Sequence, residues 1–78
     1  MNVRSEFLNI LQSYIDFPVE ELPTDEGFKA SSGIDSFTLI ELIAETEEKF
    51  SLSIPNTALM QFRTINDIIG YIESNIKP

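Results

Sequence analysis

The sequence has no cysteine and no histidine, and these two absences exclude several classes of protein. Without cysteine, the chain can form neither a disulfide framework nor a thiol nucleophile. Without histidine, it also lacks the commonest general base and the usual ligands of zinc and iron. We therefore expect no metal site and no catalytic residues, so the chain is predicted not to be an enzyme.

Basic residues and long hydrophobic runs are also scarce. The 5 bases stand against 13 acids, for a net charge of −8, and a polyanion is repelled by nucleic acid and by anionic membrane surfaces. No apolar run approaches the roughly 20 residues that span a membrane. The first residues, Met1 to Arg4, lead into polar positions rather than into the apolar region of an export signal. We expect a cytoplasmic protein without nucleic-acid or membrane partners, which binds basic protein surfaces instead.

The apolar content suffices for one small core. The 78 residues allow one domain, 1–78, and 42% of them are hydrophobic, which argues against disorder. Apolar residues recur at intervals of three and four, which is helical spacing, and no strand-like alternation is present. The predicted fold class is therefore all-α, a four-helix bundle with three longer helices and one short helix.

Helix-breaking and helix-capping residues set the predicted bounds of these helices. Pro18 is expected to end the first helix, and Asp35 and Asn56 are expected to cap the second and third. Thr64 begins a capping signal for the fourth helix, in which Gly70 suggests close packing. The predicted helices are 3–16, 36–50, 56–62 and 65–76, with a long loop, 17–35. The apolar side chains expected to hold that loop are Val19, Leu22 and Phe28.

The second predicted helix has two apolar faces when it is wound at about 100° per residue. The wider face, assigned to the core, contains Leu39, Leu42, Ile43, Thr46 and Phe50. The other face contains Phe37, Ile40 and Ala44, and its carboxylate rim consists of Glu41, Glu45, Glu47 and Glu48. An apolar patch with a charged rim, outside the core face, is typical of a partner-binding surface. The alternative is that this patch packs against the long loop.

Ser36 stands at the start of this helix, directly after Gly33-Ile34-Asp35. The unpaired backbone N–H groups and the dipole of a helix favour negative charge at its N-terminus. A phosphodiester on the Ser36 hydroxyl would therefore lie in a favourable field. The same position also suits a serine that only caps or begins a helix, which is a common role.

The segment Gly33-Ile34-Asp35-Ser36-Phe37, followed by Ile40-Glu41-Leu42, resembles the phosphopantetheine attachment motif of acyl carrier proteins. That motif reads G-x-D-S-L before an acidic and apolar helix. The likeness extends from Phe28 to Ile76 through Glu47-Glu48-Lys49-Phe50, Ile54-Pro55, Thr64-Ile65 and Tyr71-Ile72. The resemblance implies 4′-phosphopantetheine, derived from coenzyme A, on Ser36, with Asp35 as the adjacent motif residue.

The resemblance also implies a function and partners. Such a carrier holds acyl intermediates as thioesters and presents them to fatty-acid, polyketide or related biosynthetic enzymes. Its expected partners are a phosphopantetheinyl transferase and acyl-loading, condensing and modifying enzymes with basic surfaces, and the carrier itself is expected to be a monomer. Ser32 and Phe37 replace leucines that are usual in the family, and Thr38 replaces an acid. These departures favour a specialised carrier over a housekeeping one.

Other readings of the sequence remain open at this point. The chain also suits an aminoacyl or peptidyl carrier, including a D-alanyl carrier, because the motif does not encode the cargo. An unmodified acidic helical interaction module would have the same charge and the same patch, but would give Ser36 no special role. An acidic calcium-binding protein is disfavoured, because Asp16 to Gly27 lacks the ligand spacing of an EF-hand loop.

Overall fold

The structure, a computed structural model, describes residues 2–27 and 33–76. Its helices are α1 (Val3–Gln12), α3 (Ser36–Phe50), α4 (Asn56–Leu59) and α5 (Ile65–Asn75), and a 3-10 turn, η1 (Val19–Glu21), lies in the first connection. No strand forms within the two described ranges. The predicted all-α bundle with three longer helices and one short helix is confirmed.

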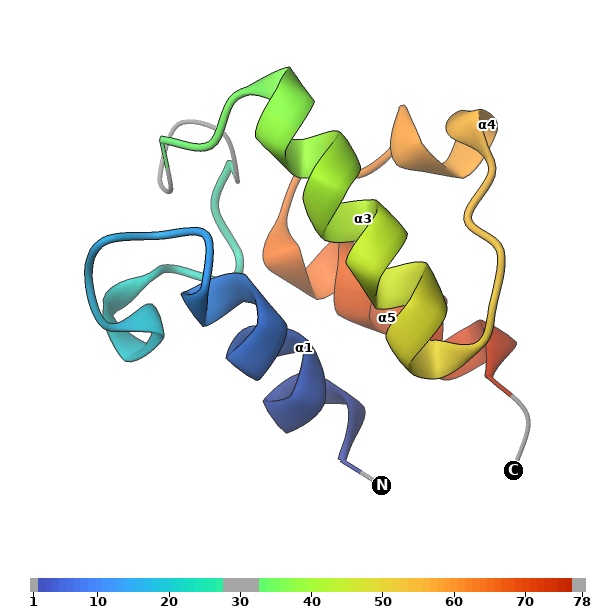
Figure 1. Ribbon diagram of the computed structural model, residues 1–78, viewed down its shortest axis with the longest axis horizontal. Helices are drawn as coiled ribbons and strands as arrows, with labels where there is room; N and C mark the ends of the chain where they lie inside the picture. The colour runs from blue at the N-terminus through green and yellow to red at the C-terminus, as the bar shows by residue number, and fades with distance from the viewer. Residues whose placement is uncertain (1, 28–32, 77–78) are drawn as a thin grey trace.

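The core lies between the three longer helices. Figure 1 shows α1 beside α3, α5 passing behind α3, and α4 on the side of α3 away from α1, and α1 contacts both α3 and α5. Each long helix contributes side chains that are almost completely buried, and the largest of these are Phe7, Leu11, Leu42, Ile65, Ile68, Ile69 and Ile72. Their spacing of three and four along each helix is why one face of each helix can enter a shared core.

The predicted core face of α3 is correct. All five of its residues, Leu39, Leu42, Ile43, Thr46 and Phe50, are buried. Thr46 is the polar member, and its Oγ1 donates a hydrogen bond of 2.8 Å to the carbonyl oxygen of Leu42. A buried hydroxyl needs such a partner, so Thr46 fills a core position without an unsatisfied polar group.

The first helix is shorter than predicted. We expected residues 3–16 and a stop at Pro18, but α1 ends at Gln12. The N–H groups of Ser13 and Tyr14 donate to carbonyl oxygens three residues back, at 3.1 and 2.9 Å. This tighter hydrogen-bond pattern closes the last turn and ends the α-helix well before the proline.

The short helix also differs from the prediction at both ends. Asn56 was expected to be its cap, but the cap position is Pro55, and Asn56 is the first helical residue. The helix ends at Leu59 rather than at residue 62, because Gln61 and Phe62 donate to carbonyl oxygens three residues back. Ala58 and Leu59 still pack against the core.

The last helix begins with the predicted capping box. The Thr64 side chain accepts from the Asp67 N–H, and the Asp67 carboxylate accepts from the Thr64 N–H. The Asp67 carboxylate also accepts from the Arg63 N–H, and this bond, followed by the one from the Thr64 N–H, holds the pKa of the Asp67 carboxyl below its usual value. The close packing expected at Gly70 is not found, because an added Cβ would meet nothing within 4 Å.

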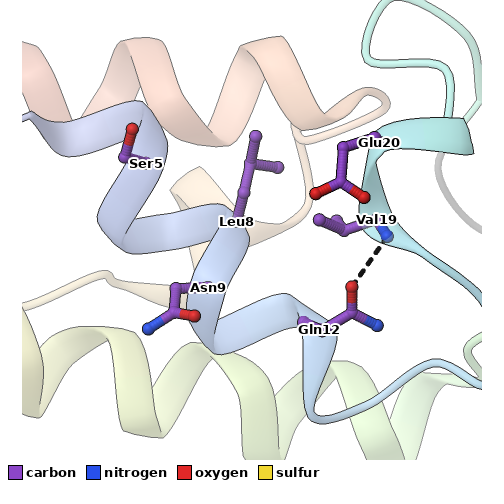
Figure 2. Close-up of a pocket in the computed structure, with 6 residues that line it drawn as sticks. All are labelled: Ser5, Leu8, Asn9, Gln12, Val19 and Glu20. Carbon is purple, nitrogen blue, oxygen red and sulfur yellow. Dashed lines mark hydrogen bonds between the residues drawn. The ribbon is translucent and has the colours of Figure 1, made fainter.

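The long loop is held by buried side chains and by one glutamine. Val19 and Leu22 are buried, as predicted, and Phe28 lies outside the described residues. The Gln12 side chain donates to the Phe17 carbonyl at 2.9 Å and accepts from the Val19 N–H at 2.8 Å. Figure 2 shows the second of these bonds, which joins the end of α1 to η1. Both ends of one amide thus fix the start of the loop against α1.

Candidate functional site

The start of α3 presents Ser36 at the surface. Gly33 has φ +74°, a left-handed conformation that glycine adopts without strain. Ile34 is then buried in the core, and Asp35 caps the helix. Ser36 follows as the first residue of α3, and it is exposed. The chain is thus anchored on both sides of an accessible serine.

Asp35 is the predicted helix cap. Its Oδ1 accepts a hydrogen bond of 2.8 Å from the Thr38 N–H. This bond, followed by smaller contributions from the Thr38 hydroxyl and the Phe37 N–H, holds the pKa of the Asp35 carboxyl below its usual value. A charged carboxylate therefore stands beside Ser36 at neutral pH, and it fixes the first turn of the helix.

The second apolar face of α3 lies in solvent. Phe37 is 71% exposed and Ile40 is 58% exposed, and Ala44 is also exposed. The alternative in which this patch packs against the long loop is therefore wrong. Together with the exposed Glu41 and Glu48, these residues form what we call the α3 face.

The other two glutamates of the predicted rim lie at the edges of this face. Glu45 Oε1 accepts a hydrogen bond of 2.7 Å from the hydroxyl of Tyr14, which lies just after α1. Glu47 is half-buried, and its Oε2 accepts from the Ile54 N–H at 2.7 Å. Each carboxylate thus ties α3 to a neighbouring segment. Glu41 and Glu48 make no hydrogen bond or ion pair with any residue that the structure describes.

Tyr14 binds Glu45 beside the α3 face, and the sequence did not predict this contact. Its hydrogen bond to Glu45, with smaller contributions from burial and from the Glu45 and Glu41 charges, raises the pKa of the Tyr14 hydroxyl to about 12. The two residues are 31 positions apart in the chain. Helical periodicity relates residues only within one element, so the sequence carried no signal for this pair.

Other features that could indicate a site carry less information. Figure 2 shows a hollow between α1 and η1, lined by Ser5, Leu8, Asn9, Gln12, Val19 and Glu20. The nitrogen and the oxygen of the Gln12 amide there are both already hydrogen-bonded to the loop backbone. Over residues 2–27 and 33–76, no group of three acidic side chains is placed to hold a metal ion. In the same ranges, no helix is long and apolar enough to cross a bilayer.

The Ser36 hydroxyl suits covalent attachment of a phosphodiester-linked group. It is exposed on the first residue of a 15-residue helix, where partial positive charge gathers. The chain has no thiol of its own, so a thioester could form only on an added group. The residues present thus fit an attached arm that brings its own thiol.

Comparison with known proteins also points to an attached group of this kind. The family described as phosphopantetheine attachment site matches residues 5–72. The acyl carrier protein of Porphyromonas gingivalis strain W83 is 28% identical over 75 residues, which is 96% of each chain. That of Aster yellows witches'-broom phytoplasma is 30% identical over 67 residues, covering 86% of this chain and 88% of the relative.

A solved structure shares the fold. The acyl carrier protein from Enterococcus faecalis superimposes with a TM-score of 0.78, covering 96% of this chain and 99% of that one, at 20% sequence identity. At this identity the likeness establishes the arrangement of helices. The match over residues 5–72 includes Ser36 and all of α3.

Proposed function

The chain belongs to the phosphopantetheine attachment family of acyl carrier proteins, and on that basis we propose that the Ser36 hydroxyl is its attachment site. The prosthetic group is 4′-phosphopantetheine, which when bound supplies a terminal thiol that holds the acyl cargo as a thioester. The observation that carries the assignment is the exposed Ser36 at the first position of α3, directly after its capping aspartate. The chain's own role is to hold and present that hydroxyl.

The first turn of α3 supports this assignment physically. Its backbone N–H groups and the helix dipole stabilise negative charge at the N-terminus. The hydrogen bond that the Asp35 carboxylate accepts from the Thr38 N–H, together with the burial of Ile34, holds the turn in place. Ser36 therefore has a defined position relative to the helix, which an enzyme that modifies it can recognise.

We further propose that the α3 face receives partner enzymes. Its partners would be a phosphopantetheinyl transferase and acyl-loading, condensing and modifying enzymes with basic surfaces, complementary to Glu41 and Glu48. Charge complementarity raises encounter rates and sets orientation more than it raises final affinity. A carrier must be released as readily as it is bound, so weak, steered contacts suit this role. The carrier itself supplies no catalytic group.

The four predicted rim glutamates contribute differently in this proposal. Glu41 and Glu48 are exposed and available to a partner. Glu45 and Glu47 already accept hydrogen bonds from Tyr14 and from the Ile54 backbone. We therefore assign steering mainly to the first pair.

The test of the attachment site is the intact mass of the chain after co-expression with a broad-specificity phosphopantetheinyl transferase. We expect the wild-type chain to gain one phosphopantetheine mass and Ser36→Ala to gain none. Ser31→Ala and Ser32→Ala are the controls, because these are the nearest other serines, and both should be modified. Circular dichroism of each variant checks that the helices form. Modification that persists in Ser36→Ala, or none in the wild type, contradicts the proposal.

A further inference from the structure

Tyr14 lies at the border between α1 and the α3 face. Its N–H donates to the Leu11 carbonyl at 2.9 Å, and its half-buried ring packs against the core. Its hydroxyl donates to Oε1 of the exposed Glu45, at 2.7 Å. Because the ring and the backbone of Tyr14 are both held by the fold, the hydroxyl has a defined position beside α3.

Three glutamates of α3 form one stripe, and Tyr14 binds the middle one. Glu41, Glu45 and Glu48 are spaced by four and by three residues, so they lie on one side of the helix. All three are exposed. Glu41 and Glu48 make no hydrogen bond or ion pair with any residue that the structure describes. The stripe thus presents two unpaired carboxylates with an occupied one between them.

The occupied oxygen changes what Glu45 can bind. A hydroxyl that donates to a carboxylate at 2.7 Å makes a charge-assisted hydrogen bond, which is about twice as strong as one between neutral groups. An arginine binds a carboxylate best through two parallel N–H groups, and this geometry needs both oxygens. With Oε1 taken by Tyr14, Glu45 offers Oε2 alone. An arginine of a partner has to displace the phenol before it can bind in that geometry.

We propose that Tyr14 is a specificity-determining residue for the enzymes that bind the α3 face. Its hydroxyl withholds Glu45 from paired arginine N–H groups, so the partners that fit best have cations that reach Glu41 and Glu48. These two carboxylates lie about 10 Å apart along the helix axis, at 1.5 Å per residue. A partner that depends on an arginine at Glu45 binds less well. This inference rests on the proposed role of the α3 face as the docking surface.

Removing the hydroxyl alone tests this role, because the ring remains. Tyr14→Phe keeps the packing of the ring and changes no charge at neutral pH. It releases both oxygens of Glu45, so the stripe gains a third available carboxylate. Glu45 lies about two and a half helical turns from Ser36, so the change should act on binding rather than on the transfer step. We therefore expect a lower KM and an unchanged kcat.

The experiment measures transfer from coenzyme A by a broad-specificity phosphopantetheinyl transferase, for the wild type, Tyr14→Phe, Glu45→Gln and the double variant. Tyr14→Phe should lower KM by roughly two- to fivefold, the range that one exposed ion pair contributes. In the Glu45→Gln background it should leave KM unchanged, because the released carboxylate is absent. Tyr71→Phe is the matched control and should match the wild type, since the Tyr71 hydroxyl lies 3.5 Å from the Ser53 carbonyl oxygen, away from the stripe.

A merely structural role for Tyr14 would give the opposite result. Loss of a bond that only holds α1 against α3 lowers the melting temperature by a few degrees and raises KM in both backgrounds. A KM that is unchanged or raised in Tyr14→Phe, or lowered equally in the Glu45→Gln background or in Tyr71→Phe, overturns the inference. These outcomes leave the attachment site and the α3 face intact. Wild-type loading that neither Glu41→Lys nor Glu48→Lys slows would instead overturn the α3 face, and a wild-type chain that is never loaded would overturn the attachment site.

Discussion

The glutamates of α3 show how residues of one type in one helix come to differ in role. Glu41, Glu45 and Glu48 are exposed and Glu47 is half-buried, but only Glu45 and Glu47 accept hydrogen bonds, each of 2.7 Å, from other described residues outside the helix. The difference arises because their angles around α3 place the second pair next to α1 and next to the segment before α4. Contacts with neighbouring elements, rather than residue type, thus decide which carboxylates remain available for contact with a partner protein.

The Tyr14–Glu45 hydrogen bond gives a prediction at this scale. In a Tyr71→Phe background, Tyr14 is the only tyrosine, and its phenol should titrate with a midpoint near pH 12 by ultraviolet absorbance. Adding Glu45→Ala removes the acceptor and the nearer charge, so the midpoint should fall toward 10. Circular dichroism at each pH checks that the helices persist. A midpoint that Glu45→Ala does not move would contradict the bond.

The sign of the linked stability follows from the direction of this shift. The folded-state pKa of Tyr14 lies above its unfolded value of 10.0. The protonated phenol is therefore the form that the fold favours, and the contribution of this bond is fully present below about pH 10. It is lost as the pH rises through about 12, so the melting temperatures of wild type and Tyr14→Phe should converge at that end of the range.

At the scale of elements, capping groups at the helix ends determine where α3 and α5 begin and where α3 ends. Asp35 and Thr64 act as side-chain caps for α3 and α5. Ser51 ends α3 in the left-handed conformation, with φ 53°, and the Leu52 N–H closes that end by donating to the Glu47 carbonyl. These bonds satisfy backbone groups that a helix end leaves unpaired, and they fix where the connecting segments leave each helix.

Two glycines, one inside a helix and one before a helix, give a paired prediction. Gly70 lies inside α5 with open space around it, so Gly70→Ala should raise the free energy of unfolding by up to about 1 kcal/mol. Gly33 has a positive φ, so Gly33→Ala should lower it by about 1–2 kcal/mol. Thermal melts measure both, at roughly 4–8 °C per kcal/mol for a domain of this size. Destabilisation by Gly70→Ala would mean that α5 does need the close approach that the sequence suggested.

At the scale of the whole molecule, size and charge suit a small mobile carrier. The radius of gyration is 11.5 Å, close to the value of about 11.5 Å expected for one compact domain of this length. The 13 acids outnumber the 5 bases, which gives a net charge of −8. One of these bases, Lys49, forms an ion pair with Glu6 at 3.3 Å. The uncompensated acids leave a field that attracts basic surfaces.

This field leads to a prediction about rates. Transfer to the wild-type chain should slow as salt rises, because screening weakens the encounter. Glu41→Lys and Glu48→Lys should each slow transfer and reduce the salt dependence, with a change in the free energy of unfolding of well under about 1 kcal/mol. The control is Glu73→Lys, an equal change of charge at an exposed position on α5. Equal slowing by the control would assign the effect to net charge rather than to the α3 face.

The sequence by itself determined the features that depend on local order along the chain. The range of α3, its core face and the caps at Asp35 and Thr64 followed from spacing and residue type, because these relate residues within a few positions of one another. The Ser36 motif is also contiguous, so the proposal of an attachment site there rests on neighbouring residues in the sequence.

Tertiary structure decided the features that join distant segments. The tighter hydrogen bonds of Ser13 and Tyr14 end α1 at Gln12, and the Gln12 side chain then binds the loop at Phe17 and Val19, which the proline rule did not anticipate. Packing left Phe37 in solvent and brought Tyr14 beside Glu45, which accepts a hydrogen bond from its hydroxyl. Periodicity specifies which side of a helix a residue lies on, but only the folded chain specifies what lies against that side.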